Sequence, residues 1–348
     1  MLMDRNNPHG GDRYGRMIRV DFSANVNPLG TPETVKHVLT DILDTLSYYP
    51  DAYCRRLRTA LSGYERIPYS QILCGNGAAD LIYAFSYAVG GKALAAVPTF
   101  SEYRTAWEAA GGTFTTFLMR ECDGFRPDGN FLSRITDKTD AVFLCVPNNP
   151  TGVLYDVSFV RAVADRCQTV GARLFLDCCF LDLSDGRENY DIPALLKNYP
   201  NLFVLKAFTK SYGMAGIRLG YGLCSDTALL ERMAKKVPCW NVSSVAQEAG
   251  IAALADTAFL ERFRNLISEE KPYLLESLLR FGFQVYEGAA NFLLFCTEKP
   301  LYDALFNRGI LIRSCANFEG LDSRYYRIAV RTHEENKILI QAIEEILK

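Results

Sequence analysis

Short apolar runs alternate with helical patterns through the first two thirds of the chain. Four of the apolar runs have the length of buried strands: 93–97, 141–146, 173–176 and 202–205. Residues 102–110 and 157–170 carry the apolar spacing of helices between these runs. Strands that are apolar on both faces and alternate with helices predict a mostly parallel sheet covered by helices on both sides. We therefore expect an α/β fold.

The pattern changes after residue 222. Helical spacing covers 228–236 and 244–266 and continues to 281, with an expected interruption near Pro272. Short strands and two further helices follow: strands at 284–286, 292–295, 310–313 and 325–330, and helices at 301–308 and 334–347. This predicts a large domain over 45–235 and a smaller α+β domain over 236–348, which the N-terminal arm, 1–44, joins. In the arm we expect a strand at 18–22 and a helix from Thr31, its N-cap, to about Asp44.

Polar loops follow several of the predicted strands. Asn149, Asp177 and Lys210 each follow a strand, and a glycine turn, Gly75–Asp80, follows the short strand at 72–74. Because ligands bind at the carboxyl ends of strands in such sheets, these loops predict one shared site. The turn opens a helix, so its backbone N–H groups can bind an anion, although a simple tight turn explains the same residues.

Lys210 and Arg218 suit a cofactor that carries both an aldehyde and a phosphate. The Lys210 amine can form a Schiff base, and the guanidinium of Arg218 can hold the phosphate. Asp177 can keep a pyridine nitrogen protonated, Asn149 can donate to a phenolic oxygen, and Phe100 can stack on a ring. Each residue also has an ordinary explanation: a surface lysine, a loop cap, an Asx turn and a core aromatic.

The composition of the chain argues against several classes of function. The 348 residues carry a net charge of -2, which gives no basic excess for nucleic acid. No apolar run approaches the length of about 18 residues that a membrane span needs, and the N-terminus lacks a signal-peptide core, so we expect a cytoplasmic protein. The 11 cysteines include no C-x-x-C pair and the three histidines are far apart, so we expect reduced thiols and no metal site.

Several motifs, taken together, resemble the fold-type I pyridoxal-phosphate enzymes over essentially the whole chain. They are Pro147-Asn-Asn-Pro-Thr-Gly152, the strand-end Asp177, Thr209-Lys210 and Gly216-Ile-Arg-Leu-Gly-Tyr221. Within that family the chain resembles the branch of histidinol-phosphate aminotransferase and threonine-phosphate decarboxylase. Three stretches bring it nearer to the decarboxylase: His9-Gly-Gly-Asp12, residues 21–30 and residues 312–331.

The resemblance implies pyridoxal 5'-phosphate as cofactor and a role for each matching residue. Lys210 forms the Schiff base and moves protons, and Asp177 pairs with the pyridinium. Asn149 contacts the phenolic oxygen and Phe100 stacks on the ring. The cofactor phosphate is held by Ala78, Ala79, Thr209 and Arg218. Tyr49 reaches the phosphate of a neighbouring subunit, so the resemblance also implies a homodimer with shared active sites.

For the substrate, the resemblance implies a small phosphorylated amino acid. Arg327 binds its carboxylate, and a second anionic group lies among Arg313, Arg331, His9 and Asn25. The implied reaction is decarboxylation of L-threonine O-3-phosphate to (R)-1-aminopropan-2-yl phosphate and carbon dioxide, in cobalamin biosynthesis. The alternatives are an aminotransferase of the histidinol-phosphate type and a non-enzymatic cofactor-binding regulator.

The chain departs from the family pattern at three positions. Cys178 stands where relatives usually have Glu, Phe180 offers no hydroxyl to the phenolic oxygen, and Ala207 replaces a Ser that binds the phosphate. These departures bear on substrate and efficiency more than on the cofactor.

Overall fold

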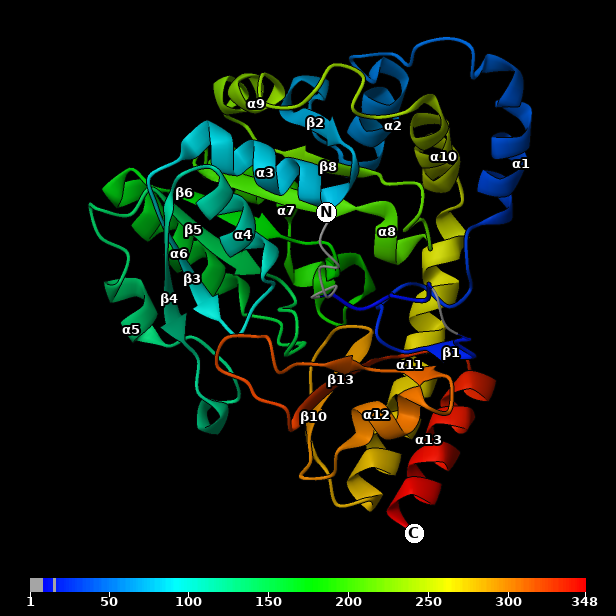
Figure 1. Ribbon diagram of the computed structural model, residues 1–348. Helices are drawn as coiled ribbons and strands as arrows, with labels where there is room; N and C mark the ends of the chain where they lie inside the picture. Colours follow the sequence, from blue (N-terminus) through cyan, green and yellow to red (C-terminus); the bar gives the residue numbers. More distant parts are fainter. Residues whose placement is uncertain (1–8, 15–16) are drawn as a thin grey trace, which may run out of the picture.

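The computed structural model describes residues 9–14 and 17–348. A seven-stranded sheet in the order β2-β8-β7-β6-β5-β3-β4 forms the centre of the larger part (Figure 1). Its strands are β2 (Ile72–Gly75), β3 (Lys92–Val97), β4 (Thr113–Leu118), β5 (Ala141–Cys145), β6 (Arg173–Asp177), β7 (Leu202–Ala207) and β8 (Gly220–Leu223). Strands β3 to β7 pair in parallel, and β8 is antiparallel to both of its neighbours. The prediction of a mostly parallel sheet is therefore confirmed.

Helices cover both faces of this sheet. They are α2 (Arg55–Glu65), α3 (Gly77–Val89), α4 (Glu102–Ala109), α5 (Gly129–Ser133), α6 (Val157–Val170), α7 (Ile192–Asn198), α8 (Phe208–Ser211) and α9 (Thr227–Ala234). Alternate residues of each strand enter different cores because side chains alternate across a strand. In β5, Phe143 packs with α3, α4 and α9, whereas Leu144 packs with α6 and α7. Both faces are buried, which explains the continuous apolar runs.

A smaller part follows, with a four-stranded antiparallel sheet in the order β12-β13-β10-β9. Its elements are α10 (Ser244–Ala255), α11 (Thr257–Arg280), β9 (Gln284–Tyr286), β10 (Phe292–Cys296), α12 (Leu301–Phe306), β11 (Ile310–Leu311), β12 (Arg313–Ser314), β13 (Tyr325–Ala329) and α13 (His333–Leu347). In the N-terminal arm, β1 (Val20–Asp21) pairs in parallel with β11, and α1 (Glu33–Asp41) packs on α10. The long α11 joins the two parts in Figure 1.

Helix α11 contributes to both cores. Phe263 and Ile267 pack in the core of the large sheet, and Leu274 and Leu278 pack in the core of the small one. No sharp boundary is visible along this helix, so the division at residues 45–235 stays a prediction. Among the described residues, no helix is both long and apolar enough to cross a membrane.

Several local predictions were wrong. Pro32 is the N-cap of α1, because the hydroxyl of Thr31 instead donates to the carbonyl of Gly213 at 2.9 Å. Pro272 lies inside α11 without ending it, and the break comes at Asp256, whose ψ of 75° is not helical. Lys210 lies in the short helix α8 rather than in a loop. The edge strand β4 was not anticipated.

Candidate active site

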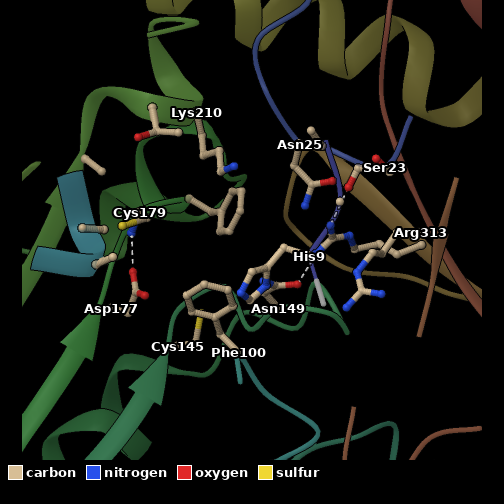
Figure 2. A pocket seen from close by; sticks show the side chains of 18 of the residues that line it. His9, Ser23, Asn25, Phe100, Cys145, Asn149, Asp177, Cys179, Lys210 and Arg313 are labelled. Atoms are coloured by element: carbon tan, nitrogen blue, oxygen red, sulfur yellow. Dashed lines mark hydrogen bonds between the residues drawn. The ribbon is translucent and has the colours of Figure 1, made fainter. Parts of the chain in front are cut away.

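A cavity of about 240 Å³ opens beside the carboxyl ends of β5, β6 and β7. Most of the residues predicted for the site line it: His9, Asn25, Ala78, Ala79, Phe100, Asn149, Asp177, Thr209, Lys210, Arg218, Arg313 and Arg327. Figure 2 shows Asp177 and Cys179 on one side and Ser23 and Arg313 on the other, with Phe100, Asn149 and His9 between them. The cavity thus brings together residues from both parts of the chain and from the N-terminal arm.

Lys210 enters the cavity from α8, directly after β7. Burial lowers the pKa of its amine to about 8, and the positive charges of Arg327 and Arg218 act in the same direction. A lysine with such a pKa is partly neutral near pH 8. It can therefore act as a nucleophile toward a carbonyl carbon or accept a proton.

Asp177 is the last residue of β6 and is buried, with 5% of its surface exposed. The hydroxyl of Tyr103 donates to Oδ2 at 2.6 Å, and the backbone N–H of Cys179 donates to Oδ1 at 3.0 Å. Burial nevertheless raises the pKa of this carboxyl group. A cation in the cavity would favour the ionised form, so this environment fits a protonated pyridine nitrogen.

The first turn of α3 and Arg218 form a cradle for an anion. Ala78 and Ala79 lie in that turn, where backbone N–H groups have no partner within the helix. Gly77 has φ +82°, and a Cβ atom there would lie 2.7 Å from Nη2 of Arg218. Only glycine therefore lets the guanidinium approach the helix so closely. With Thr209 on the same cavity, these groups fit the phosphate of pyridoxal phosphate.

Arg327 links the cavity wall to the N-terminal arm. It lies on β13 with 6% of its surface exposed, donates to Oδ1 of Asn149, and donates to the carbonyl oxygen of Ser23 at 2.8 Å. Burial lowers the pKa of the guanidinium to about 10. Its Nε atom and Oδ1 of Asn25 are buried without a partner in the described part of the chain. A guanidinium held in this way fits a carboxylate ligand.

His9 and Arg313 lie at the side of the cavity that the arm and β12 form. His9 Nε2 is 2.9 Å from Oε1 of Glu102, and its ring centroid is 5.5 Å from that of Phe100. The guanidinium of Arg313 lies 5.0 Å from the ring centroid of Phe318 and donates to Oδ1 of Asn317 at 2.7 Å. The guanidinium of Arg313, with the ring of His9 on the same cavity, provides a second place for an anion.

Two predicted site residues do not line this cavity. Tyr49 is 79% exposed and stacks on Trp240 with ring centroids 4.4 Å apart. Arg331 donates from Nη2 to Oε1 of Glu335 at 2.8 Å, beside the capping box of α13. Their expected roles stay predictions.

The sequence did not point to several residues at the site. Tyr103 binds Asp177, and Cys145, Cys179 and Phe318 line the cavity. The local signal that could have found Tyr103 is its closeness in sequence to Phe100, since it lies three residues later in the first turn of α4. The departures Phe180 and Ala207 both line the cavity, where a bound cofactor or substrate would lie beside them.

Comparisons with known proteins place the chain among enzymes of one family. The model of the family "Aminotransferase class I and II" matches residues 18–343. Threonine-phosphate decarboxylase from Salmonella typhimurium is 39% identical over 333 residues, covering 94% of this chain and 91% of the relative. Two solved structures each align with 94% of this chain, and the alignment includes 99% of the solved chain in both cases. Histidinol-phosphate aminotransferase from Clostridium acetobutylicum has a TM-score of 0.87 at 29% identity. L-Threonine-O-3-phosphate decarboxylase from Porphyromonas gingivalis has a TM-score of 0.82 at 25% identity.

These similarities confirm three predictions: the fold-type I architecture, an enzymatic rather than a purely regulatory protein, and pyridoxal phosphate as the cofactor. They include both a decarboxylase and an aminotransferase, so the choice of reaction depends on the site.

Proposed function

Because this chain belongs to the class I and II aminotransferase family, we propose that it decarboxylates L-threonine O-3-phosphate. The products would be (R)-1-aminopropan-2-yl phosphate and carbon dioxide, which would give the protein a place in cobalamin biosynthesis. The observation that carries this proposal is that Arg327 and Arg313 line the same cavity as Lys210, in addition to Arg218 beside α3. We assign the guanidinium of Arg218 to the cofactor phosphate. The guanidinium groups of Arg327 and Arg313 then remain for a substrate with two anionic groups.

Pyridoxal phosphate, when bound, supplies an aldehyde for the substrate amine and an electron sink for the bond that breaks. Asp177 would hold the proton at the ring nitrogen, supported by the hydrogen bond from Tyr103. Ala78, Ala79, Thr209 and Arg218 would bind the phosphate. Because the pKa of Lys210 is about 8, its Nζ can give up its proton and return one to the substrate Cα after carbon dioxide leaves.

The two remaining arginines would orient the substrate. Arg327 would bind the carboxylate, while Arg313 and His9 would bind the phosphate with Asn25 beside them. Binding at two separated points fixes rotation about the bonds to Cα, and this rotation decides whether the carboxylate or the Cα hydrogen is removed. Arg331, paired with Glu335, would act at the edge of this subsite.

We also propose a homodimer with shared sites. Tyr49 and Trp240 form an exposed aromatic stack, and Tyr48, also exposed, lies on the same loop as Tyr49. Adjacent exposed aromatic side chains of this kind are typical of protein interfaces. A second copy would cover them and receive Tyr49 at its cofactor phosphate.

The decisive experiment supplies the purified, cofactor-loaded protein with L-threonine O-3-phosphate and no keto acid. We expect release of one carbon dioxide per substrate and formation of the amino-alcohol phosphate. The competing function is transamination of histidinol phosphate, favoured by the TM-score of 0.87 to such an enzyme. Turnover of histidinol phosphate with 2-oxoglutarate, in the absence of any decarboxylation, would refute the proposal.

A further inference from the structure

Helix α4 contacts two segments that border the second anion site, the N-terminal arm and the segment 315–321. Glu102 and Arg104 lie in its first turn. Glu102 contacts the N-terminal arm at His9, and Arg104 contacts the segment 315–321 at Glu319. These segments lie 93 residues before and 215 residues after their partners on the helix. One helical turn therefore fixes two distant pieces of chain around the same part of the cavity.

The arm is held on two sides. His9 Nε2 lies 2.9 Å from Oε1 of Glu102. Gly10 packs so closely that a Cβ atom there would lie 2.2 Å from the carbonyl oxygen of Ser23, and the N–H of Gly11 donates to Oγ of Ser23 at 2.7 Å. With the backbone fixed at Ser23 and the ring fixed at Glu102, His9 has little freedom over the cavity.

The segment 315–321 is held in a similar way. Nη2 of Arg104 donates to Oε2 of Glu319 at 2.6 Å, and the hydroxyl of Thr116 donates to Oε1 at 2.6 Å. Gly320, with φ +91°, lies against β4, where a Cβ atom would be 2.5 Å from Cδ1 of Leu118. Phe318, the residue before Glu319, lines the cavity beneath the guanidinium of Arg313.

We propose that Glu102 and Arg104 are positioning residues that set the selectivity for a phosphorylated substrate over its unphosphorylated analogue. The proposal rests on the proposed function to the extent that His9 and Arg313 bind the substrate phosphate. The carboxylate of Glu102 accepts a hydrogen bond from Nε2–H of His9 and so fixes the orientation of the ring beside the substrate phosphate. Arg104 neutralises Glu319 and holds Phe318 against Arg313.

A simple charge effect predicts the opposite result. Glu102 is a negative charge beside an anion site, so its removal would strengthen phosphate binding if it acted only through its charge. If it acts by holding His9, its removal weakens phosphate binding. The sign of the change in affinity therefore distinguishes the two roles.

The test compares Glu102→Gln, Glu102→Asp, Arg104→Met and Arg104→Lys with Glu298→Gln as a control. Glu298 forms an exposed ion pair with Arg324 and does not line the cavity. For each holoenzyme, kcat and KM are measured with L-threonine O-3-phosphate and with L-threonine. We expect Glu102→Gln and Arg104→Met to lower the selectivity for the phosphorylated compound about 10-fold through KM. Glu102→Asp and Arg104→Lys should recover part of it, and the control should not change it.

Combining His9→Ala with Glu102→Gln completes the test. The double variant should be no less selective than His9→Ala alone, because Glu102 acts through His9. Unchanged selectivity, an equal loss for both substrates, or tighter binding of the phosphorylated compound would overturn the inference. If the wild type proves to be a histidinol-phosphate aminotransferase, the same ratio is measured with histidinol phosphate and histidinol. The reaction of the wild type therefore tests the proposed function, and the change in selectivity of the variants tests this inference separately.

Discussion

The hydroxyl of Tyr103 donates a 2.6 Å hydrogen bond to Oδ2 of Asp177, between the first turn of α4 and the end of β6. Tyr103 is completely buried, and burial raises the pKa of its phenol well above the usual value. Its hydroxyl therefore remains protonated, and a hydrogen-bond donor, near neutral pH. The bond favours the ionised form of a carboxyl group that burial alone would tend to neutralise.

Replacing Tyr103 with Phe should weaken cofactor binding. A hydrogen bond to a charged group contributes about 1.5–3 kcal/mol, so we expect the dissociation constant of pyridoxal phosphate to rise about 10- to 100-fold. Fluorescence titration of the apoprotein measures this. Tyr190→Phe is the matched control, because it removes a buried hydrogen bond to the carbonyl of Tyr155, outside the cavity. Equal effects of the two variants would show that Tyr103 has no specific role.

The lowered pKa of Lys210 predicts how the stability of the apoprotein varies with pH. The folded pKa is about 8 and the unfolded value about 10.4, so the unfolded state binds more protons between these values. Stability contributed through this group therefore rises with pH in that window. Lys210→Met should be more stable than wild type below pH 8, by on the order of 3 kcal/mol, and the difference should disappear above about pH 10.4. Urea denaturation of both apoproteins across this range measures it.

The same substitution should abolish turnover. Loss of the amine would remove the proposed covalent link to the cofactor and the proposed proton transfer, which alone contributes about 10²- to 10⁴-fold. Borohydride treatment followed by peptide mapping should label wild type at Lys210 and leave the variant unlabelled. Labelling at another lysine in wild type would contradict the assignment.

We expect Lys206, four residues before Lys210, to contribute to folding stability and not to the reaction at the active site. Its Nζ lies 2.8 Å from Oε1 of Glu65 and 3.0 Å from Oδ1 of Asp182, and Tyr221 also donates to Glu65. Burial alone would lower the pKa of Lys206, but the two carboxylates raise it. We expect Lys206→Met to lose about 3–5 kcal/mol at pH 7, because it leaves Glu65 buried and unpaired. Thermal and urea denaturation measure the loss.

A double variant checks that explanation. Adding Glu65→Gln to Lys206→Met removes the unpaired charge and should restore part of the stability. Borohydride labelling of Lys210 should persist in Lys206→Met under conditions where it is folded. A loss of labelling without a loss of stability would assign Lys206 to the active site instead.

Shared active sites predict complementation between inactive variants. Tyr49→Ala and Lys210→Ala damage opposite sides of one site if Tyr49 comes from the neighbouring subunit. Mixed dimers then contain one intact site and one doubly damaged site, so co-refolding equal amounts should restore about a quarter of wild-type activity. A mixture that stays inactive while forming dimers would place Tyr49 and Lys210 in the same subunit's site.

Local patterns and family motifs were enough to predict most of the polar residues that line the cavity. The strands β3, β5, β6 and β7 were predicted because both faces of each are buried and their apolar runs are continuous. The polar residues that follow these strands lie at one edge of the sheet because the strands run parallel. The ends of helices were less well predicted, as Thr31 and Pro272 show, because a hydrogen bond to Gly213 or the packing of α11 outweighs the local preference.

The sequence by itself determined the cofactor of this protein through its family motifs, and it placed Lys210, Asp177 and Asn149 after strands that end at one sheet edge. Only the tertiary structure decided which side chains hold these groups. Tyr103 meets Asp177 across 74 residues, and His9 meets Glu102 across 93. It also separated two lysines that are close in sequence, Lys210 facing the cavity and Lys206 facing Glu65. Such pairs depend on strand order and on the packing of α4 and the arm, and neither leaves a periodic pattern in the chain.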